Sequence, residues 1–109
     1  MAENDFLDEI VDERTAKNPN FPRLVENARR RRELLGTLAA ERESQRVSQT
    51  QVAASMGSSQ SSLARLERTA VDAKLSTVEK LANALGLAVQ YHLVDADAAR
   101  NKPSVVVHR

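Results

Sequence analysis

The stretch from Ser48 to Glu67, SQTQVAASMGSSQSSLARLE, decides the fold of this chain. Apolar residues recur in each half of it at the spacing of one helix face, and Gly57 lies between the two halves. A helix commonly ends at a glycine, because glycine adopts the left-handed backbone without strain. Ser58 and Ser59 then offer an N-cap for a second helix. The stretch therefore predicts two short helices joined by a tight turn.

The outward face of the second helix carries the chemistry. Leu63 and Leu66 point to one side, and the opposite arc holds no acid and no large apolar group. Glutamine, serine and arginine can hydrogen-bond base edges and phosphates, and a small alanine lets the helix lie close to DNA. A solvated surface is the alternative, but the helix, turn and cap before it favour a major-groove reader. The arc comprises Gln60, Ser61, Ala64, Arg65 and Arg68.

The wider pattern resembles the Xre/Cro (phage-repressor-like) helix-turn-helix domains. The matching segments, within residues 34–94, are Leu38 to Arg46, SQTQVAASMG, SSQSSLARLER and STVEKLANALGL. The resemblance implies a mainly α fold: a five-helix helix-turn-helix domain with an N-terminal helical extension and one or two short C-terminal β-strands. We place the extension at 1–33, the DNA-binding domain at 34–87 and the strand region at 88–109.

The resemblance and the outward arc together predict the DNA contacts, because the start of each helix approaches DNA in this family. Gln60, Ser61 and Arg65 are expected to touch base edges, and Ala64 to pack near a thymine methyl group. Gln49 and Arg68 are expected to hold phosphates. The expected DNA-binding set is Gln49, Ser59, Gln60, Ser61, Ala64, Arg65 and Arg68.

Length and composition bound the remaining possibilities. A chain of 109 residues with 41% hydrophobic content supports one domain with a modest core. It has no cysteine, no signal-like run and no apolar stretch of about 20 residues, so we expect a cytoplasmic protein without a membrane span. His92 and His108 are isolated, and no Gly-rich phosphate loop occurs. We therefore expect no catalysis, no metal and no cofactor.

The net charge of +1 hides an uneven distribution. Residues 1–20 hold six acidic and two basic side chains, a net charge of −4. Residues 21–70 hold nine arginines and five glutamates, a net charge of +4. The predicted DNA-binding segment is thus basic, and its attraction to phosphate should weaken with salt.

The acidic end predicts a short amphipathic helix from Asp5 to about Thr15. It is too short to be stable alone, so its apolar face should cover the chain's own core or bind a partner. Prolines at 19 and 22 interrupt the pattern. From Pro22 to about Glu43 we expect one long helix or two in series, with any bend at Gly36. The apolar face at the acidic end consists of Phe6, Leu7, Ile10 and Val11.

The C-terminal third predicts one more helix and a strand. Ser76 and Glu79 form a capping-box pattern, and the helix should end at Gly86. Apolar and polar residues then alternate from Ala88 to Val94, which is typical of a half-exposed strand, and a second β-prone run lies at 105–107. The buried stripe of the helix should be Val78, Leu81, Ala82 and Leu85.

Two functions fit this pattern: a stand-alone transcriptional repressor, and the antitoxin of a toxin–antitoxin pair. Over nearly its whole length the chain is similar to HigA-type antitoxins, because FLDEIVDERTAKNPNFPRLVENARRRRELL precedes the DNA-binding domain. We prefer the antitoxin, since a lone repressor needs no acidic amphipathic extension.

The resemblance implies three partners. They are a double-stranded DNA operator, a cognate HigB/RelE-like RNase toxin bound by residues 1 to about 35, and a second copy of the chain. The toxin anchors would be Phe6, Leu7, Ile10 and Val11. One recognition helix reads too few base pairs for a regulator, so two copies should meet half-sites about 34 Å apart. The expected dimer contacts are Val89, Tyr91 and Leu93.

Overall fold

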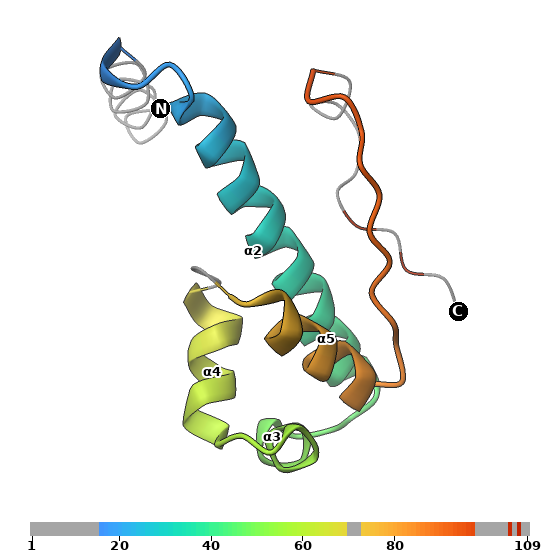
Figure 1. Cartoon of the computed structure of the whole chain (residues 1–109). Helices are drawn as coiled ribbons and strands as arrows, with labels where there is room; N and C mark the ends of the chain where they lie inside the picture. Colours follow the sequence, from blue (N-terminus) through green and yellow to red (C-terminus); the bar gives the residue numbers. More distant parts are fainter. Residues whose placement is uncertain (1–15, 70–72, 98–104, 106, 108–109) are drawn as a thin grey trace.

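Helices form the framework of the molecule (Figure 1). The computed structural model describes residues 16–69, 73–97, 105 and 107. These contain four helices, namely α2 (Phe21–Ser44), α3 (Gln49–Met56), α4 (Gln60–Thr69) and α5 (Leu75–Ala84). The mainly α prediction is confirmed. A five-helix domain is not confirmed, because the described residues of 34–87 contain the second half of α2 and the helices α3, α4 and α5. The helix expected at Asp5 to Thr15, in the N-terminal extension, lies outside the described residues.

The helix α2 is a single unit of 24 residues. A turn at Asn18–Phe21 precedes it, and Pro22 lies in its first turn, where a missing N–H costs nothing. It continues through Gly36, so the alternative of two helices in series is excluded. The first half of α2 extends beyond the other helices, and its second half packs on them (Figure 1).

The two short helices begin and end as the sequence predicts. Ser48 caps α3 in a capping box with Gln51, and the Ser59 Oγ accepts a hydrogen bond from the Ser62 N–H at 3.2 Å. Gly57 lies after α3 with φ 69°, and Gly86 lies after α5 with φ 76°. After each of these glycines, the next N–H donates to the carbonyl oxygen five residues earlier, so α3 and α5 both end in a Schellman motif.

The capping box predicted at Ser76 and Glu79 is wrong. The helix α5 already begins at Leu75, and its N-cap Lys74 makes no side-chain capping bond. Ser76 therefore lies inside the first turn. The carboxylate of Glu79 instead accepts a hydrogen bond of 2.6 Å from the Tyr91 hydroxyl, so a tertiary contact uses the group that the local pattern assigned to the cap.

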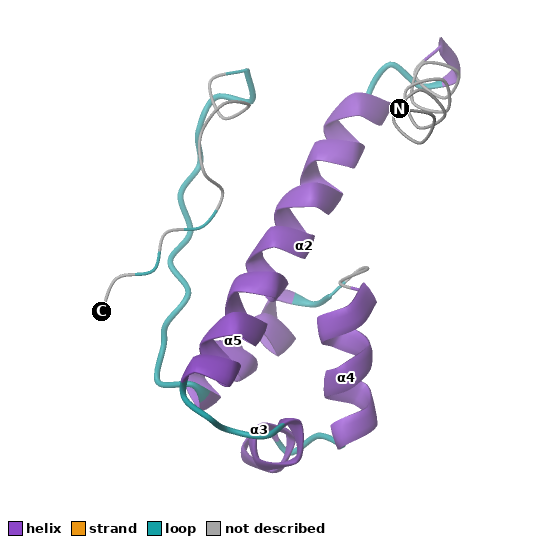
Figure 2. Cartoon of the chain, turned by 180° about the vertical axis from the view of Figure 1, so that it is seen from behind, coloured by secondary structure: helices purple, strands orange, loops and turns teal. Residues whose placement is uncertain are grey.

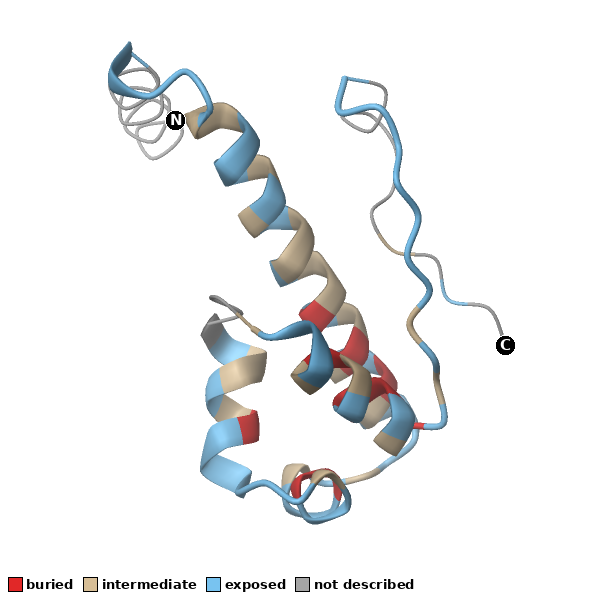
Figure 3. Ribbon diagram, in the orientation of Figure 1, coloured by how far each residue is buried: buried red, intermediate tan, exposed pale blue. Residues whose placement is uncertain are grey.

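The core lies where α2, α3, α4 and α5 meet (Figure 3). The stripes predicted for the short helices are buried, and Met56 and Leu66 pack partly buried against them. Because these side chains leave water together, their burial supplies the main driving force for this arrangement. The buried apolar set is Leu35, Leu38, Val52, Ala53, Leu63, Val78, Leu81, Ala82 and Leu85.

The core does not reach the first half of α2. Leu24 lies on the same side of α2 as the buried Leu35 and Leu38, but it is 52% exposed, and Val25 is 38% exposed. The periodicity is correct, since these residues do follow one side of the helix. These two side chains are exposed because α3, α4 and α5 end below this level (Figure 3).

The strand predicted from Ala88 to Val94 is not formed in the described structure. Residues 87–95 follow an irregular path that leaves the end of α5 on the side away from α4 (Figure 2). A strand needs a ladder partner, and the described residues supply none. The segment is held instead by partly buried Leu87 and Val89 on the core and by the Tyr91 bond to Glu79. Of the second β-prone run only Val105 and Val107 are described, neither in a strand.

Candidate nucleic-acid interface

The starts of α3 and α4 are brought side by side and joined by a side-chain hydrogen bond. The Nε2 of Gln60, the first residue of α4, donates to the Oε1 of Gln49, the first residue of α3, at 2.7 Å. Each glutamine directly follows the serine that caps its helix. The caps and this amide bond therefore hold two of the predicted DNA-binding residues in one place, with Gln60 exposed to solvent.

An ion pair behind this bond connects three helices. The Nε of Arg42 in α2 donates to Oε1 of Glu67 in α4 at 2.7 Å, and its Nη2 donates to Oε2 at 3.2 Å. The same carboxylate accepts from the Nε2 of Gln49 in α3 at 3.3 Å. Both charged side chains are about nine-tenths buried. A two-pronged arginine bond fixes orientation, so the pair sets how α3 and α4 lie relative to α2.

Arg42 also donates from Nη1 to the carbonyl oxygen of Val47 at 3.0 Å, in the connection before α3. The hydrogen bond that the Arg42 guanidinium donates to Glu67 raises its pKa, so this group stays charged throughout the working pH range. This ion pair could not be predicted from the sequence. Arg42 and Glu67 lie 25 residues apart, and nothing in the local periodicity of either residue indicates the partner.

The outward arc of α4 is solvent-exposed as predicted. Gln60, Ser61, Arg65 and Arg68 are exposed, and Ala64 is partly buried. The single acid of α4, Glu67, points inward and forms an ion pair with Arg42, so the arc itself carries no negative charge. The arc therefore presents amides, a hydroxyl and guanidinium groups without a carboxylate, as a phosphate- and base-binding helix requires.

Ser59 has a structural role that restricts its expected DNA contact. Its Oγ accepts from the Ser62 N–H and donates to the Ser62 Oγ at 2.8 Å. The donor of this hydroxyl is thus engaged within the turn.

The two residues expected to hold phosphates lie at opposite ends of the arc. At about 1.5 Å of rise per residue, Arg68 lies about 12 Å along α4 from Gln60, beside which Gln49 lies.

The remaining predicted site residues lie elsewhere. The anchors Phe6, Leu7, Ile10 and Val11 fall outside the described residues. Among the expected dimer contacts, Val89 is partly buried on the core and Leu93 is fully exposed, while Tyr91 bonds to Glu79.

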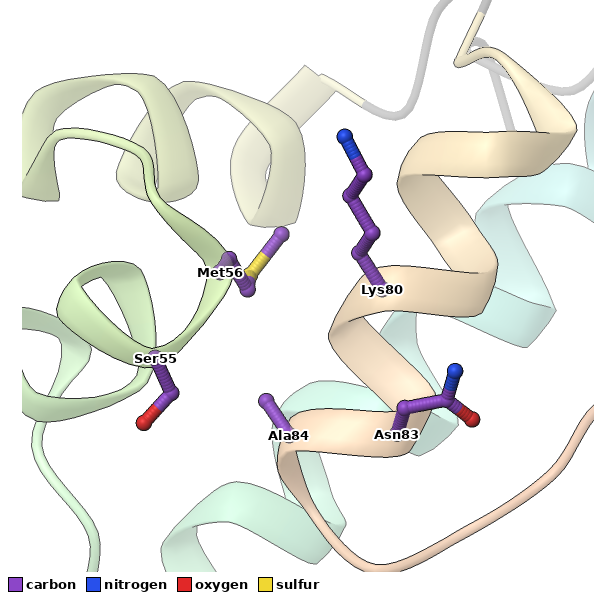
Figure 4. Close-up of a pocket in the computed structure, with 5 residues that line it drawn as sticks. All are labelled: Ser55, Met56, Lys80, Asn83 and Ala84. Carbon is purple, nitrogen blue, oxygen red and sulfur yellow. The ribbon is translucent and has the colours of Figure 1, made fainter.

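A shallow hollow between α3 and α5 offers different chemistry from the arc (Figure 4). The side chains of Met56 and Lys80 extend into the space between the helices, with Asn83 at the edge. Its lining combines a thioether, an ammonium group, an amide, the Ala84 methyl group and the Ser55 hydroxyl. This hydroxyl donates to the Gln51 carbonyl oxygen at 3.3 Å and points away from Lys80 (Figure 4). In the described part of the chain no cluster of His, Cys, Asp or Glu is suited to a metal, and no helix is long and apolar enough to cross a membrane.

The short helices, the tight turn and the acid-free outward arc define a helix-turn-helix DNA-binding protein. The helix-turn-helix family HTH_3 matches residues 38–92, which is 55 of the 109 residues, and the chain belongs to this family. The family is a DNA-binding domain without catalytic function, so the chain is a DNA-binding regulator. Comparison with curated proteins gives no match, and comparison with solved structures gives none either.

Proposed function

We propose that this chain is a sequence-specific transcriptional repressor that places α4 in the major groove of an operator. The observation that carries this proposal is the joined start of α3 and α4, where Gln49 holds Gln60 at the edge of an exposed arc without acids. A positioned amide can bind an adenine edge in two places, and the arginines of the arc can bind guanine or phosphate.

Selection from a random duplex library tests DNA reading directly. We expect an enriched sequence that binds at nanomolar concentrations and loses affinity steeply as salt rises. The variant Gln60→Ala should bind the selected duplex more weakly and discriminate less against a scrambled one, whereas Gln90→Ala, outside the helices, should not. Equal affinity of the original chain for both duplexes would refute sequence-specific reading.

The repressor function extends to that of an antitoxin, which neutralises a ribosome-dependent RNase toxin and represses its own operon. Residues 1 to about 35 would bind the toxin through Phe6, Leu7, Ile10 and Val11. The position of α2 supports this division, because its start lies at the end of the molecule opposite to the starts of α3 and α4 (Figure 1). A protein bound at the extension would therefore leave the DNA-binding arc accessible.

Two variants separate these activities. Deleting residues 1–17 should abolish rescue of cells that express the toxin encoded beside this gene, and should leave operator binding nearly intact. The matched variant Arg65→Ala should weaken operator binding and still rescue. If the truncated chain rescues fully, the extension does not bind the toxin, and a stand-alone repressor is the better description.

Repression by two copies completes the proposal. Each α4 reads only a few base pairs, so a homodimer would place two arcs on half-sites about one DNA turn apart. The exposed side chains of Leu93 and Val94 support a contact through the C-terminal segment, because large apolar groups this exposed are candidates for burial against a partner.

A further inference from the structure

In the first half of α2, the side that carries Leu24 and Val25 lacks cover from the rest of the described structure. The first fully buried residue of the helix is Leu35, and before it Leu24 and Val25 are exposed. These two side chains follow the same side of the helix as partly buried Ala28. An amphipathic face of three turns is therefore available for a further segment (Figure 3).

A tight turn before α2 reverses the direction of the chain. The Phe21 N–H donates to the Asn18 carbonyl oxygen at 2.9 Å, and the Asn20 N–H donates to the Asn18 Oδ1 at 3.0 Å. Pro19 and Asn20 occupy the central positions, and Asn20 has φ −85° and ψ −4°, as in a type I turn. Such a turn between two helices produces an antiparallel helical hairpin.

The charge and the length of residues 5–15 match those of the exposed face of α2. Residues 16–34 contain six basic and two acidic side chains, a net charge of +4. Residues 5–15, just before the turn, contain five acids and one arginine, a net charge of −4, together with an apolar stripe. As a helix these 11 residues would span about 16 Å, which equals the rise of α2 over its first three turns.

We propose that residues 5–15 dock in the same chain on the Leu24–Arg32 half of α2. The apolar stripe of this segment would cover Leu24, Val25 and Ala28, and its acids would face the four arginines at 29–32. The stripe consists of Phe6, Leu7, Ile10 and Val11. The docked segment removes apolar surface from water on both helices, and the opposite charges set its orientation.

The docking has a regulatory consequence, and this consequence rests on the proposed antitoxin function. One apolar face cannot cover α2 and bind a toxin at the same time. The hairpin must therefore open before the anchors reach the toxin, which makes neutralisation a competition between α2 and the toxin.

Disulfide trapping tests the docking, because the chain has no cysteine of its own. The full-length variant Ile10→Cys/Ala28→Cys should form an intramolecular disulfide in most molecules under mild oxidation at low protein concentration. Leu7→Cys/Arg31→Cys, one helical turn further from the loop, should do the same. The matched control Asp8→Cys/Ala28→Cys, with one cysteine on the polar face, should remain largely reduced.

The other outcomes overturn the proposal. Covalent dimers would assign the α2 face to a second copy, and failure of both test pairs would assign it to a foreign partner or to solvent. If the control pair forms the disulfide as readily as the test pairs, residues 5–15 do not dock on α2 in one orientation. In the trapped variant operator affinity should not change, and rescue from the toxin should fall until reductant is added. If trapping succeeds but rescue is absent even when reduced, the hairpin stands and the antitoxin function fails.

Discussion

The Gln49–Gln60 bond shows how single side chains position the outward arc of α4. It joins the first residues of two helices, and the Arg42–Glu67 pair behind it holds both helices on α2. The polar groups of the arc are thus placed before DNA arrives, which lowers the ordering cost of binding.

Arg65 is the residue of the arc best suited to read a guanine. We expect Arg65→Ala to weaken operator binding by roughly 1 to 3 kcal/mol and to relax the preference at one base pair, because a guanidinium bonds two acceptors of guanine at once. Fluorescence anisotropy with labelled operator and substituted duplexes measures both effects. Arg23→Ala, which removes the same charge from the exposed first half of α2, should leave affinity nearly unchanged. Equal losses in the two variants would mean that Arg65 acts only through overall charge.

Tyr91 provides a single-residue probe of the C-terminal segment, because it is the one tyrosine of the chain. Its bond to Glu79 raises the pKa of the phenol, since only the protonated hydroxyl can donate to the carboxylate. The contribution of this bond to the stability of the fold is therefore fully present below the unfolded pKa of about 10. It is lost as the pH rises through the raised pKa of the folded state.

Tyrosinate absorbance followed against pH should give a midpoint above that of a free tyrosine. Glu79→Ala should lower the midpoint towards about 10, and Lys80→Ala, its exposed neighbour, should not lower it. If the midpoint is the same in the chain and in Glu79→Ala, the bond does not form in solution.

At the scale of the elements, two glycines of similar surroundings should respond to alanine in opposite directions. An added Cβ meets nothing within 4 Å at Gly36 or at Gly57, so backbone conformation alone decides the effect. Gly36 lies within α2, and Gly36→Ala should stabilise the fold by about 0.4 to 1 kcal/mol. Gly57 has φ 69°, and Gly57→Ala should destabilise it by about 1 to 2 kcal/mol.

Urea unfolding of the two variants beside the original chain measures these differences. The pair also tests the continuity of α2. A destabilising Gly36→Ala would indicate that the helix bends at this residue in solution, as the sequence allowed.

At the scale of the whole molecule, the proposed dimer depends on the C-terminal segment. The Leu93 side chain makes no buried contact in the chain, so Leu93→Asp should leave the monomer folded and shift the dimer towards monomer in sedimentation velocity. Gln90→Asp adds the same charge at an exposed polar position and should stay dimeric. A dimer that persists in Leu93→Asp would place the contact on the helices.

The amino-acid sequence was enough to predict the short helices of the DNA-binding domain, the glycine ends of α3 and α5, their buried stripes and the outward arc of α4. These features depend on spacing over a few residues, where helical geometry and backbone preferences act directly. The family match at residues 38–92 agrees with the same stretch.

Only the tertiary structure decided which groups meet across the chain. It paired Arg42 with Glu67 and gave Glu79 to Tyr91 instead of a helix cap. It also left Leu24 outside the core, although the stripe continues to it. Local periodicity states which side of a helix is apolar, but burial and strand pairing need a second surface. The position of that surface depends on how all the helices pack together.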